Sequence, residues 1–156
     1  MLPLLKSYKP EIISLRELTD LYFDYYHISF LTFTAIEKCD RFGKKIFTSF
    51  VPRLEGRLCE KAWKELPVHF QHCLVGDHKI KPYEFQAFLI IDKFHSEELA
   101  AKYVPKILAS FKSRSTKLLN QYMGTHGKAF WENSYSENVI AGLDELEEAL
   151  ETIDKL

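Results

Sequence analysis

Aromatic and β-branched residues dominate residues 25–36, which read YYHISFLTFTAI and contain neither glycine nor proline. This composition is typical of a β-strand. Apolar side chains fall on both alternating faces of the segment, with Phe30 on one face and Leu31 on the other. We therefore predict a central strand that is covered on at least part of both faces.

After a polar loop around Gly43, the spacing of apolar residues changes to steps of three and four, which predicts an amphipathic helix. In this helix Pro52 would lie in the first turn, where its missing N–H costs nothing, and Pro67 would end it. The apolar positions that define the helix are Phe47, Phe50, Val51, Leu54, Leu58, Ala62 and Leu66.

Two strands are predicted next, at residues 68–75 and 83–91, with a loop that holds residues 76–77 between them. A second long helix is expected to begin at Pro105 and to end at Gly124. Its apolar face consists of Tyr103, Ile107, Leu108, Phe111, Leu118, Leu119 and Tyr122.

The remaining segments complete the predicted architecture. Residues 96–103 would form a separate turn, and the acidic residues 144–155 a C-terminal helix. The order strand, helix, two strands, helix and helix predicts an α+β fold, a ferredoxin-like antiparallel sheet with helices packed on it. Residues 1–20 are expected to be a peripheral N-terminal segment with a short helix near its end, and residues 21–156 a single domain.

Composition narrows the class of protein. The chain has 156 residues, 46% of them hydrophobic, and a formal net charge of −1, so bulk charge would not hold it on a nucleic acid. Its longest unbroken apolar run, residues 87–91, is far too short to span a membrane. Three cysteines without a Cys-x-x-Cys motif suggest neither a disulfide frame nor a zinc site. We expect a soluble protein of the cytoplasm, without a membrane partner.

Charge is distributed unevenly along the chain. Residues 102–117 contain five cations and no acid, whereas residues 132–156 contain eight acids and one cation, Lys155. Two interpretations are open: two solvated helix faces, or a basic helix that faces phosphates with an acidic helix docked nearby. None of the six histidines has the spacing of a metal pair, and no Gly-x-Ser-x-Gly or phosphate-loop motif is present. The residues alone therefore indicate no reaction.

Several segments, in order, resemble the single-tyrosine HUH transposases of bacteria, which include the REP-associated tyrosine transposases. The segments are residues 26–34 (YHISFLTFT), 111–115 (FKSRS) with Asn120, 127–131 (GKAFW) and 134–140 (SYSENVI). The resemblance extends over about residues 25–153. It implies a ferredoxin-like fold, a homodimer, and single-stranded or hairpin DNA as the ligand.

The chain departs from this family at both catalytic features. The family's motif Met-Pro-Asn-His-hydrophobic-His, whose histidines bind a divalent metal, corresponds to residues 87–95. Aligned on the right end of this segment, His95 is the second histidine and Lys93 replaces the first; aligned on its left end, neither histidine is kept. A cation at a ligand position repels the metal. Thr152 stands where the family has its nucleophilic tyrosine. The resemblance thus implies a transposase-like DNA-binding protein that has lost cleavage, with His95 and Thr152 as remnants and Mg²⁺ or Mn²⁺ needed only by an active member.

The predicted DNA-binding residues come from the basic helix and the aromatic stretch after it. Basic side chains would contact phosphates, while aromatic rings would stack on unpaired bases or, alternatively, pack in the core. These residues are Lys112, Arg114 and Lys117 for the phosphates, and Trp131 and Tyr135 for the bases.

Two further functions remain open at this point, so the sequence leaves undecided whether the chain is an enzyme. One is an active metal-dependent nuclease with a rearranged site that combines His95 with His69 or His72 and with Glu97. The other is a protein-interaction module that uses the acidic C-terminal helix.

Overall fold

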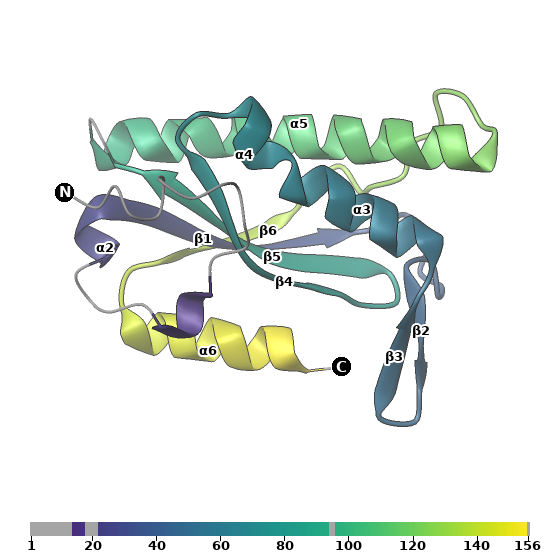
Figure 1. Cartoon of the computed structure of the whole chain (residues 1–156), viewed down its shortest axis with the longest axis horizontal. Coiled ribbons are helices and arrows are strands. Elements are labelled where there is room, and N and C mark those ends of the chain that lie inside the picture. Colours follow the sequence, from purple (N-terminus) through teal and green to yellow (C-terminus); the bar gives the residue numbers. More distant parts are fainter. Residues whose placement is uncertain (1–13, 18–21, 94–95, 156) are drawn as a thin grey trace.

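A four-stranded antiparallel sheet forms the centre of the computed structural model, which describes residues 14–17, 22–93 and 96–155 (Figure 1). The strand order is β4-β5-β1-β6. The strands are β1 (Tyr26–Thr34), β4 (Cys73–Ile80), β5 (Glu84–Asp92) and β6 (Ser136–Ile140). The predictions of an α+β fold and of a central strand at residues 25–36 are confirmed, because β1 pairs with β5 on one side and β6 on the other.

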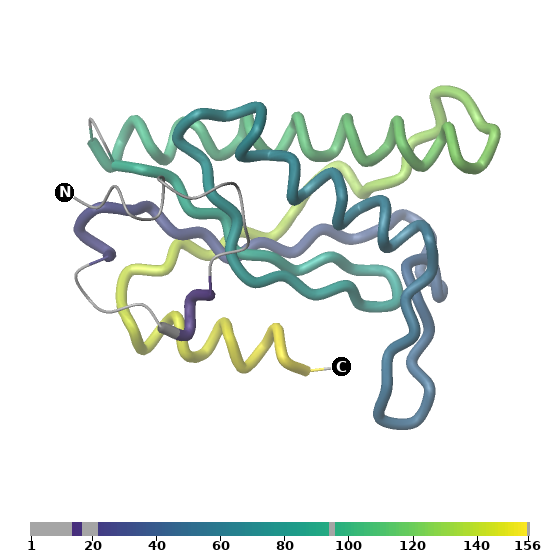
Figure 2. The backbone as a smooth tube through the Cα atoms, viewed as in Figure 1, coloured from purple at the N-terminus to yellow at the C-terminus, as the bar shows by residue number. Residues whose placement is uncertain are grey.

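Helices cover both faces of this sheet (Figure 1). On one face lie α3 (Leu54–Lys64), α4 (Leu66–His69) and the long α5 (Glu97–Met123). On the other face lie η1 (Leu15–Glu17), α2 (Tyr22–Tyr25) and α6 (Leu143–Asp154). The backbone trace in Figure 2 shows α5 and α6 on opposite sides of the strands.

Alternation along β1 creates two hydrophobic cores. Leu31 and Phe33 point towards α3 and α5, whereas Ile28 and Phe30 point towards α6. The first core is rich in aromatic rings, with the centroid of Phe33 4.9 Å from that of Phe111. Burying both faces of one strand is what the apolar pattern of the sequence predicted.

The predicted helix from Phe47 to Leu66 is wrong in its first third. Residues there form a separate hairpin of β2 (Gly43–Ile46) and β3 (Ser49–Pro52), and α3 begins at Leu54. Apolar residues at 47, 50 and 51 fit a helical spacing, but Pro52 ends a strand instead of opening a helix. Phe50 packs against the first core, while Phe47 is exposed.

The predicted strand at 68–75 and its loop are also displaced. Residues Leu66–His69 are helical, and β4 runs through Gly76 and Asp77 as a β-bulge between Val75 and His78. Glycine is required in this bulge because a Cβ at position 76 would lie 2.9 Å from Cβ of Phe88 and 3.0 Å from Cδ1 of Leu15. In the sequence Gly76 indicated a loop between two strands, whereas in the structure it lies in a bulge within β4.

Helix α5 is continuous through Pro105, so the predicted break before this residue is wrong. The proline removes one helical hydrogen bond at an exposed position, whereas Val104, Ile107 and Leu108 around it are buried. Burial on the sheet therefore outweighs the local penalty. The predicted end is confirmed, since Gly124 adopts the left-handed conformation (φ 69°) of a helix C-cap.

Helix α6 confirms the predicted C-terminal helix, but within one chain it does not dock on α5. Its buried residues join the second core, on the far face of the sheet. Lys79 and Lys81 of the β4 end donate to the carbonyl oxygens of Asp154 (3.0 Å) and Thr152 (3.1 Å) at its last turn. Of residues 1–20 the structure describes 14–17, where Leu15 is fully buried and Arg16 pairs with Asp154.

Among the described residues, we find no helix with both the length and the apolar character that crossing a membrane requires.

An ion pair between Glu60 of α3 and His78 of β4 (2.6 Å) makes the stability of the fold sensitive to acid. The hydrogen bond from His78 lowers the pKa of Glu60 below its ordinary value. A carboxyl group whose pKa is lower in the folded state than in the unfolded state stabilises the fold. This stabilisation is fully present above the pKa of the unfolded state, about 4.3 for Glu, and is lost as the pH falls through the pKa of the folded state. We expect Glu60→Gln to destabilise the protein at neutral pH and progressively less below about pH 4.

Urea denaturation across this pH range measures the effect. Glu98→Gln is the matched control, because Glu98 is highly exposed and lies 3.6 Å from Lys102. Equal behaviour of the two variants at every pH would contradict the prediction.

Candidate nucleic-acid interface

The outward side of α5 carries a row of lysines. Buried residues recur every three or four positions on its sheet-facing side, so at 100° per residue Lys102, Lys106 and Lys117 lie on the opposite side, where they are exposed. Lys102 and Lys117 are about 22 Å apart along the axis at 1.5 Å per residue. From residue 99 to residue 131 the sequence contains no acid.

Helix α3, on the same face of the sheet, adds cations to this row. Arg57, Lys61 and Lys64 are exposed and lie opposite the buried side of α3. We call the outward cations of the two helices the basic helix layer: Arg57, Lys61, Lys64, Lys102, Lys106, Arg114 and Lys117. Within the described ranges, Lys61, Lys64, Lys106 and Lys117 have no carboxylate within 4.0 Å, whereas Arg57 pairs with Glu60.

Two of the predicted phosphate ligands, Arg114 and Lys117, line one groove of about 600 Å³ beside Glu65. Arg114 is held in place: its Nε donates to Ser110 Oγ (3.0 Å) and its guanidinium to His69 Nε2 (2.6 Å). Ser113 and Gln121 also line the groove. Guanidinium, ammonium, hydroxyl and amide donors together suit the oxygens of a phosphate.

Lys112 and Tyr135 lie on the other flank of α5. The Lys112 ammonium donates to the carbonyl oxygens of Glu132 (2.7 Å) and Asn133 (3.2 Å), and burial lowers its pKa. Tyr135 is half-buried, with its ring 5.9 Å from the Lys112 ammonium and 5.6 Å from the ring of Phe33. Lys112 therefore fixes the segment that follows Trp131.

Trp131 belongs to the core rather than to the surface. It is 5% exposed, and its indole N–H donates to Ser115 Oγ at 2.8 Å. Its ring lies 5.8 Å from that of Phe33 and 5.7 Å from that of Phe111. Of the two interpretations of this residue, burial supports core packing and leaves no face on which a base could stack.

The two positions expected to mark a former catalytic site are not brought together. Lys93 follows β5, where its ammonium donates to Phe23 O (2.7 Å) and pairs with Glu97 (2.8 Å). Thr152 lies near the opposite end of β5. The ammonium of Lys81 donates to the carbonyl oxygen of Thr152, and the backbone N–H of Lys81 donates to Glu84 O, at the first residue of β5. Nine strand residues span about 30 Å.

Neither Thr152 nor the proposed metal ligands form a reactive centre. The exposed Thr152 hydroxyl donates to Glu148 O (3.0 Å), with no base beside it among the described residues. His69 binds Arg114 and lines, together with His72, a cavity of about 200 Å³, whereas Glu97 binds Lys93. His95 lies outside the described residues. Within these limits, no three His, Cys, Asp or Glu side chains gather as a metal site.

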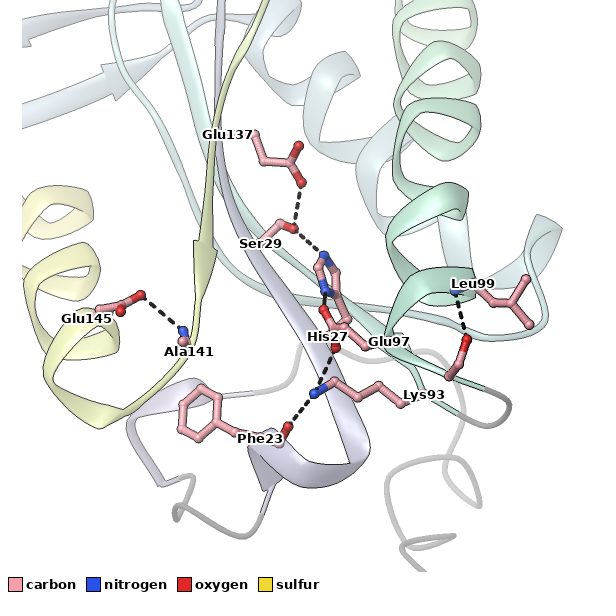
Figure 3. A network of polar contacts seen from close by, with 10 residues as sticks. Phe23, His27, Ser29, Lys93, Glu97, Leu99, Glu137, Ala141 and Glu145 are labelled. Carbon is pink, nitrogen blue, oxygen red and sulfur yellow. Dashed lines mark hydrogen bonds and ion pairs between the residues drawn. The ribbon is translucent and has the colours of Figure 1, made fainter.

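A polar network with two buried members, which the sequence reasoning missed, joins β1, β6 and the start of α5 (Figure 3). His27 is 3% exposed; its Nδ1 contacts Glu97, and its Nε2 lies 3.2 Å from Ser29 Oγ. Burial would raise the pKa of Glu97, but the hydrogen bonds from Lys93 and His27 outweigh it and lower this pKa.

Ser29 is fully buried and donates to Glu137 (2.9 Å). The contacts from Glu97 through His27 and Ser29 to Glu137 therefore hold α5, β1 and β6 together and do not form a nucleophile–base pair. The signal in the sequence was two polar residues, His27 and Ser29, at alternate positions of an apolar strand.

A scan against models of protein families finds no match to this chain, and a search of curated proteins finds no relative.

We expect Ser115→Ala to lower the free energy of unfolding by about 1–3 kcal/mol, because it leaves the buried indole N–H of Trp131 without an acceptor. Urea denaturation measures the change. Ser113→Ala removes an exposed hydroxyl two residues away and should stay within about 0.5 kcal/mol of the wild type. A Ser115→Ala protein as stable as Ser113→Ala would contradict the core position of Trp131.

Proposed function

We propose that this chain is a transposase-like DNA-binding protein that binds single-stranded or hairpin DNA along the basic helix layer and does not cleave it. The observation that carries the proposal is the separation of charge between the two faces of the sheet. Among the described residues, Lys61 and Lys64 of α3 and Lys106 and Lys117 of α5 are exposed without a carboxylate partner, whereas the exposed side of α6 is acidic. Phosphates are therefore attracted to one side of the molecule and repelled from the other.

We also infer a ferredoxin-like topology for the sheet. Its support is the succession β1-α3-β4-β5-α5-β6, in which α3 and α5 share one face and the strand order is β4-β5-β1-β6. Two interleaved β-α-β units produce this order. The same topology is what the resemblance to the single-tyrosine HUH transposases implies.

The separation of Lys93 from Thr152 favours another alignment of the family's histidine motif. Residues 81–86 read Lys-Pro-Tyr-Glu-Phe-Gln, which keeps the proline and the hydrophobic residue of Met-Pro-Asn-His-hydrophobic-His. Glu84 and Gln86 then occupy the two histidine positions. This alignment is supported by Lys81, whose backbone N–H donates to Glu84 O and whose ammonium donates to Thr152 O, so that Glu84 and Thr152 lie towards the same end of the sheet.

The residues in this alignment do not assemble a complete site for the Mg²⁺ or Mn²⁺ ion of the family, because within the described residues no three His, Cys, Asp or Glu side chains gather. One carboxylate and one amide replace the two imidazoles, and the positive charge of Lys81 interacts with Glu84 and so opposes a cation there. Gln86 is 7% exposed; its amide nitrogen contacts Thr32 Oγ1 (3.5 Å), and burial restricts access to its amide oxygen. Without a three-ligand metal site among the described residues and with a threonine in place of the tyrosine at position 152, binding without cleavage is the activity that the residues support.

Replacing Lys106 and Lys117 by Gln tests where DNA binds. For single strands, each lost phosphate contact reduces the slope of log K against log salt by about 0.7, so the double variant should lose about 1.4. Between about 50 and 200 mM salt, the ratio of the wild-type affinity to the affinity of the double variant should therefore change roughly sevenfold. Fluorescence anisotropy with a labelled oligonucleotide at several salt concentrations measures the slope.

Lys155→Gln is the control, because it removes one exposed positive charge at the end of α6, on the other face of the sheet. It should leave the slope unchanged. A double variant with the wild-type slope would contradict binding at the basic helix layer.

Cleavage is tested directly with an end-labelled hairpin oligonucleotide in Mg²⁺ or Mn²⁺. We expect neither nicked DNA nor a covalent protein–DNA adduct, because the described residues offer Thr152 no activating base and Glu84 and Gln86 take the positions of the two histidines in this alignment. An adduct on a denaturing gel would show that cleavage has been retained.

A second candidate function is the binding of a protein partner at α6. Leu143, Leu146 and Leu150 line a groove of about 470 Å³ between α6 and η1, with Glu147 and Glu151 at its side. An apolar groove with an acidic border suits a basic amphipathic segment. The homodimer implied by the resemblance stays a prediction.

A further inference from the structure

The β2–β3 hairpin extends away from the sheet beside the start of α3 (Figures 1 and 2). Its base is fixed: Arg53 N donates to Phe42 O (2.7 Å), Phe42 is fully buried, and the ring of Phe50 lies over Gly43. At the tip, residues 46–49 are all exposed. The hairpin is thus an arm that is anchored at one end and free at the other.

Phe47 at the tip is both exposed and conformationally unfavourable. Its side chain is 93% exposed, the highest value for a large hydrophobic residue in the described part of the chain. Its φ of 55° lies in the left-handed region, which residues other than glycine, asparagine and aspartate rarely adopt. The fold gains no packing from this ring, which leaves it available for a contact outside the molecule.

The surroundings of Phe47 are basic. Residues 41–54 contain four cations and no acid. Lys44 and Lys45, on the strand that leads to the tip, are exposed, and no described carboxylate lies within 4.0 Å of either ammonium. Ile46 and Val51 add exposed apolar surface close to the ring.

We propose that this hairpin is a nucleic-acid-binding arm in which Phe47 stacks on an unpaired base and Lys44 and Lys45 contact the flanking phosphates. A two-stranded ribbon is narrow enough to enter a nucleic-acid groove, and apolar side chains at such tips insert between bases. An aromatic ring can stack on any of the four bases, so the contact requires no particular sequence. This inference rests on the proposed function and extends the basic helix layer to a second contact.

The charge favours a nucleic acid over the two other occupants of an exposed apolar tip. A protein pocket for Phe47 would need compensating acids against Lys44 and Lys45, and a bilayer would need more apolar area than one aromatic ring with Ile46 and Val51 provides. Both alternatives are outcomes of the test.

The test compares the binding of a single-stranded oligonucleotide that contains 2-aminopurine to the wild type and to Phe47→Ala, Phe47→Trp and Phe47→Leu. Stacking of one base predicts a loss of affinity of about 5- to 150-fold for Phe47→Ala, a similar loss for Phe47→Leu, and retention in Phe47→Trp. Only the wild type and Phe47→Trp should change the 2-aminopurine emission. Tyr25→Ala, which removes an exposed aromatic ring at the other end of β1, is the control and should bind as the wild type does.

Thermal melts accompany the titrations. The exposed ring predicts an unchanged melting temperature, and Phe47→Gly, which accepts a positive φ, replaces Phe47→Ala if the latter folds poorly. Wild-type affinity in Phe47→Ala would overturn the arm and leave the basic helix layer standing, whereas a wild type that binds no oligonucleotide would overturn both. Equal binding by Phe47→Leu and the wild type, or Phe47-dependent sedimentation with phosphatidylserine–phosphatidylcholine vesicles, would assign the tip to hydrophobic docking instead.

Discussion

The burial of β1 on both faces is the constraint on which the rest of the structure depends. Leu31 and Phe33 require one apolar layer and Ile28 and Phe30 another, so helices must cover both sides of the sheet. The basic α3 and α5 fill one layer, and the acidic α6 fills the other. A packing requirement thus separates the charges, and the resulting asymmetry gives the molecule one side that attracts phosphates.

Parts of this fold could be predicted from the sequence because their signals are local. The strand at residues 25–36 and the left-handed cap at Gly124 depend on neighbouring residues alone. The hairpin was missed because Phe47, Phe50 and Val51 fit a helical spacing as well as a strand pair. The bulge at Gly76 depends on Leu15, 61 positions earlier, and the continuity of α5 depends on how its sheet-facing residues pack.

In the candidate site too, some residue positions follow from local patterns and others depend on contacts with distant parts of the chain. Helical geometry fixes which residues share a face, and Lys117, a predicted phosphate ligand, lies exposed on the outward side of α5. Whether Lys112 is free depends on Asn133, beyond its own helix, and whether Trp131 is exposed depends on Ser115 of α5. The distance between Lys93 and Thr152 depends on where α6 docks along β5, which no local pattern contains.

The measurement that tests the account most directly is a titration of the isotopically labelled protein with a single-stranded oligonucleotide, followed through its backbone amide resonances. Binding by the basic side predicts perturbed signals on the outward side of α5, from Lys102 to Lys117, and at the tip of the hairpin around Phe47. The amides of α6 should not move. Shifts concentrated on α6, or no shifts at low salt, would contradict the account.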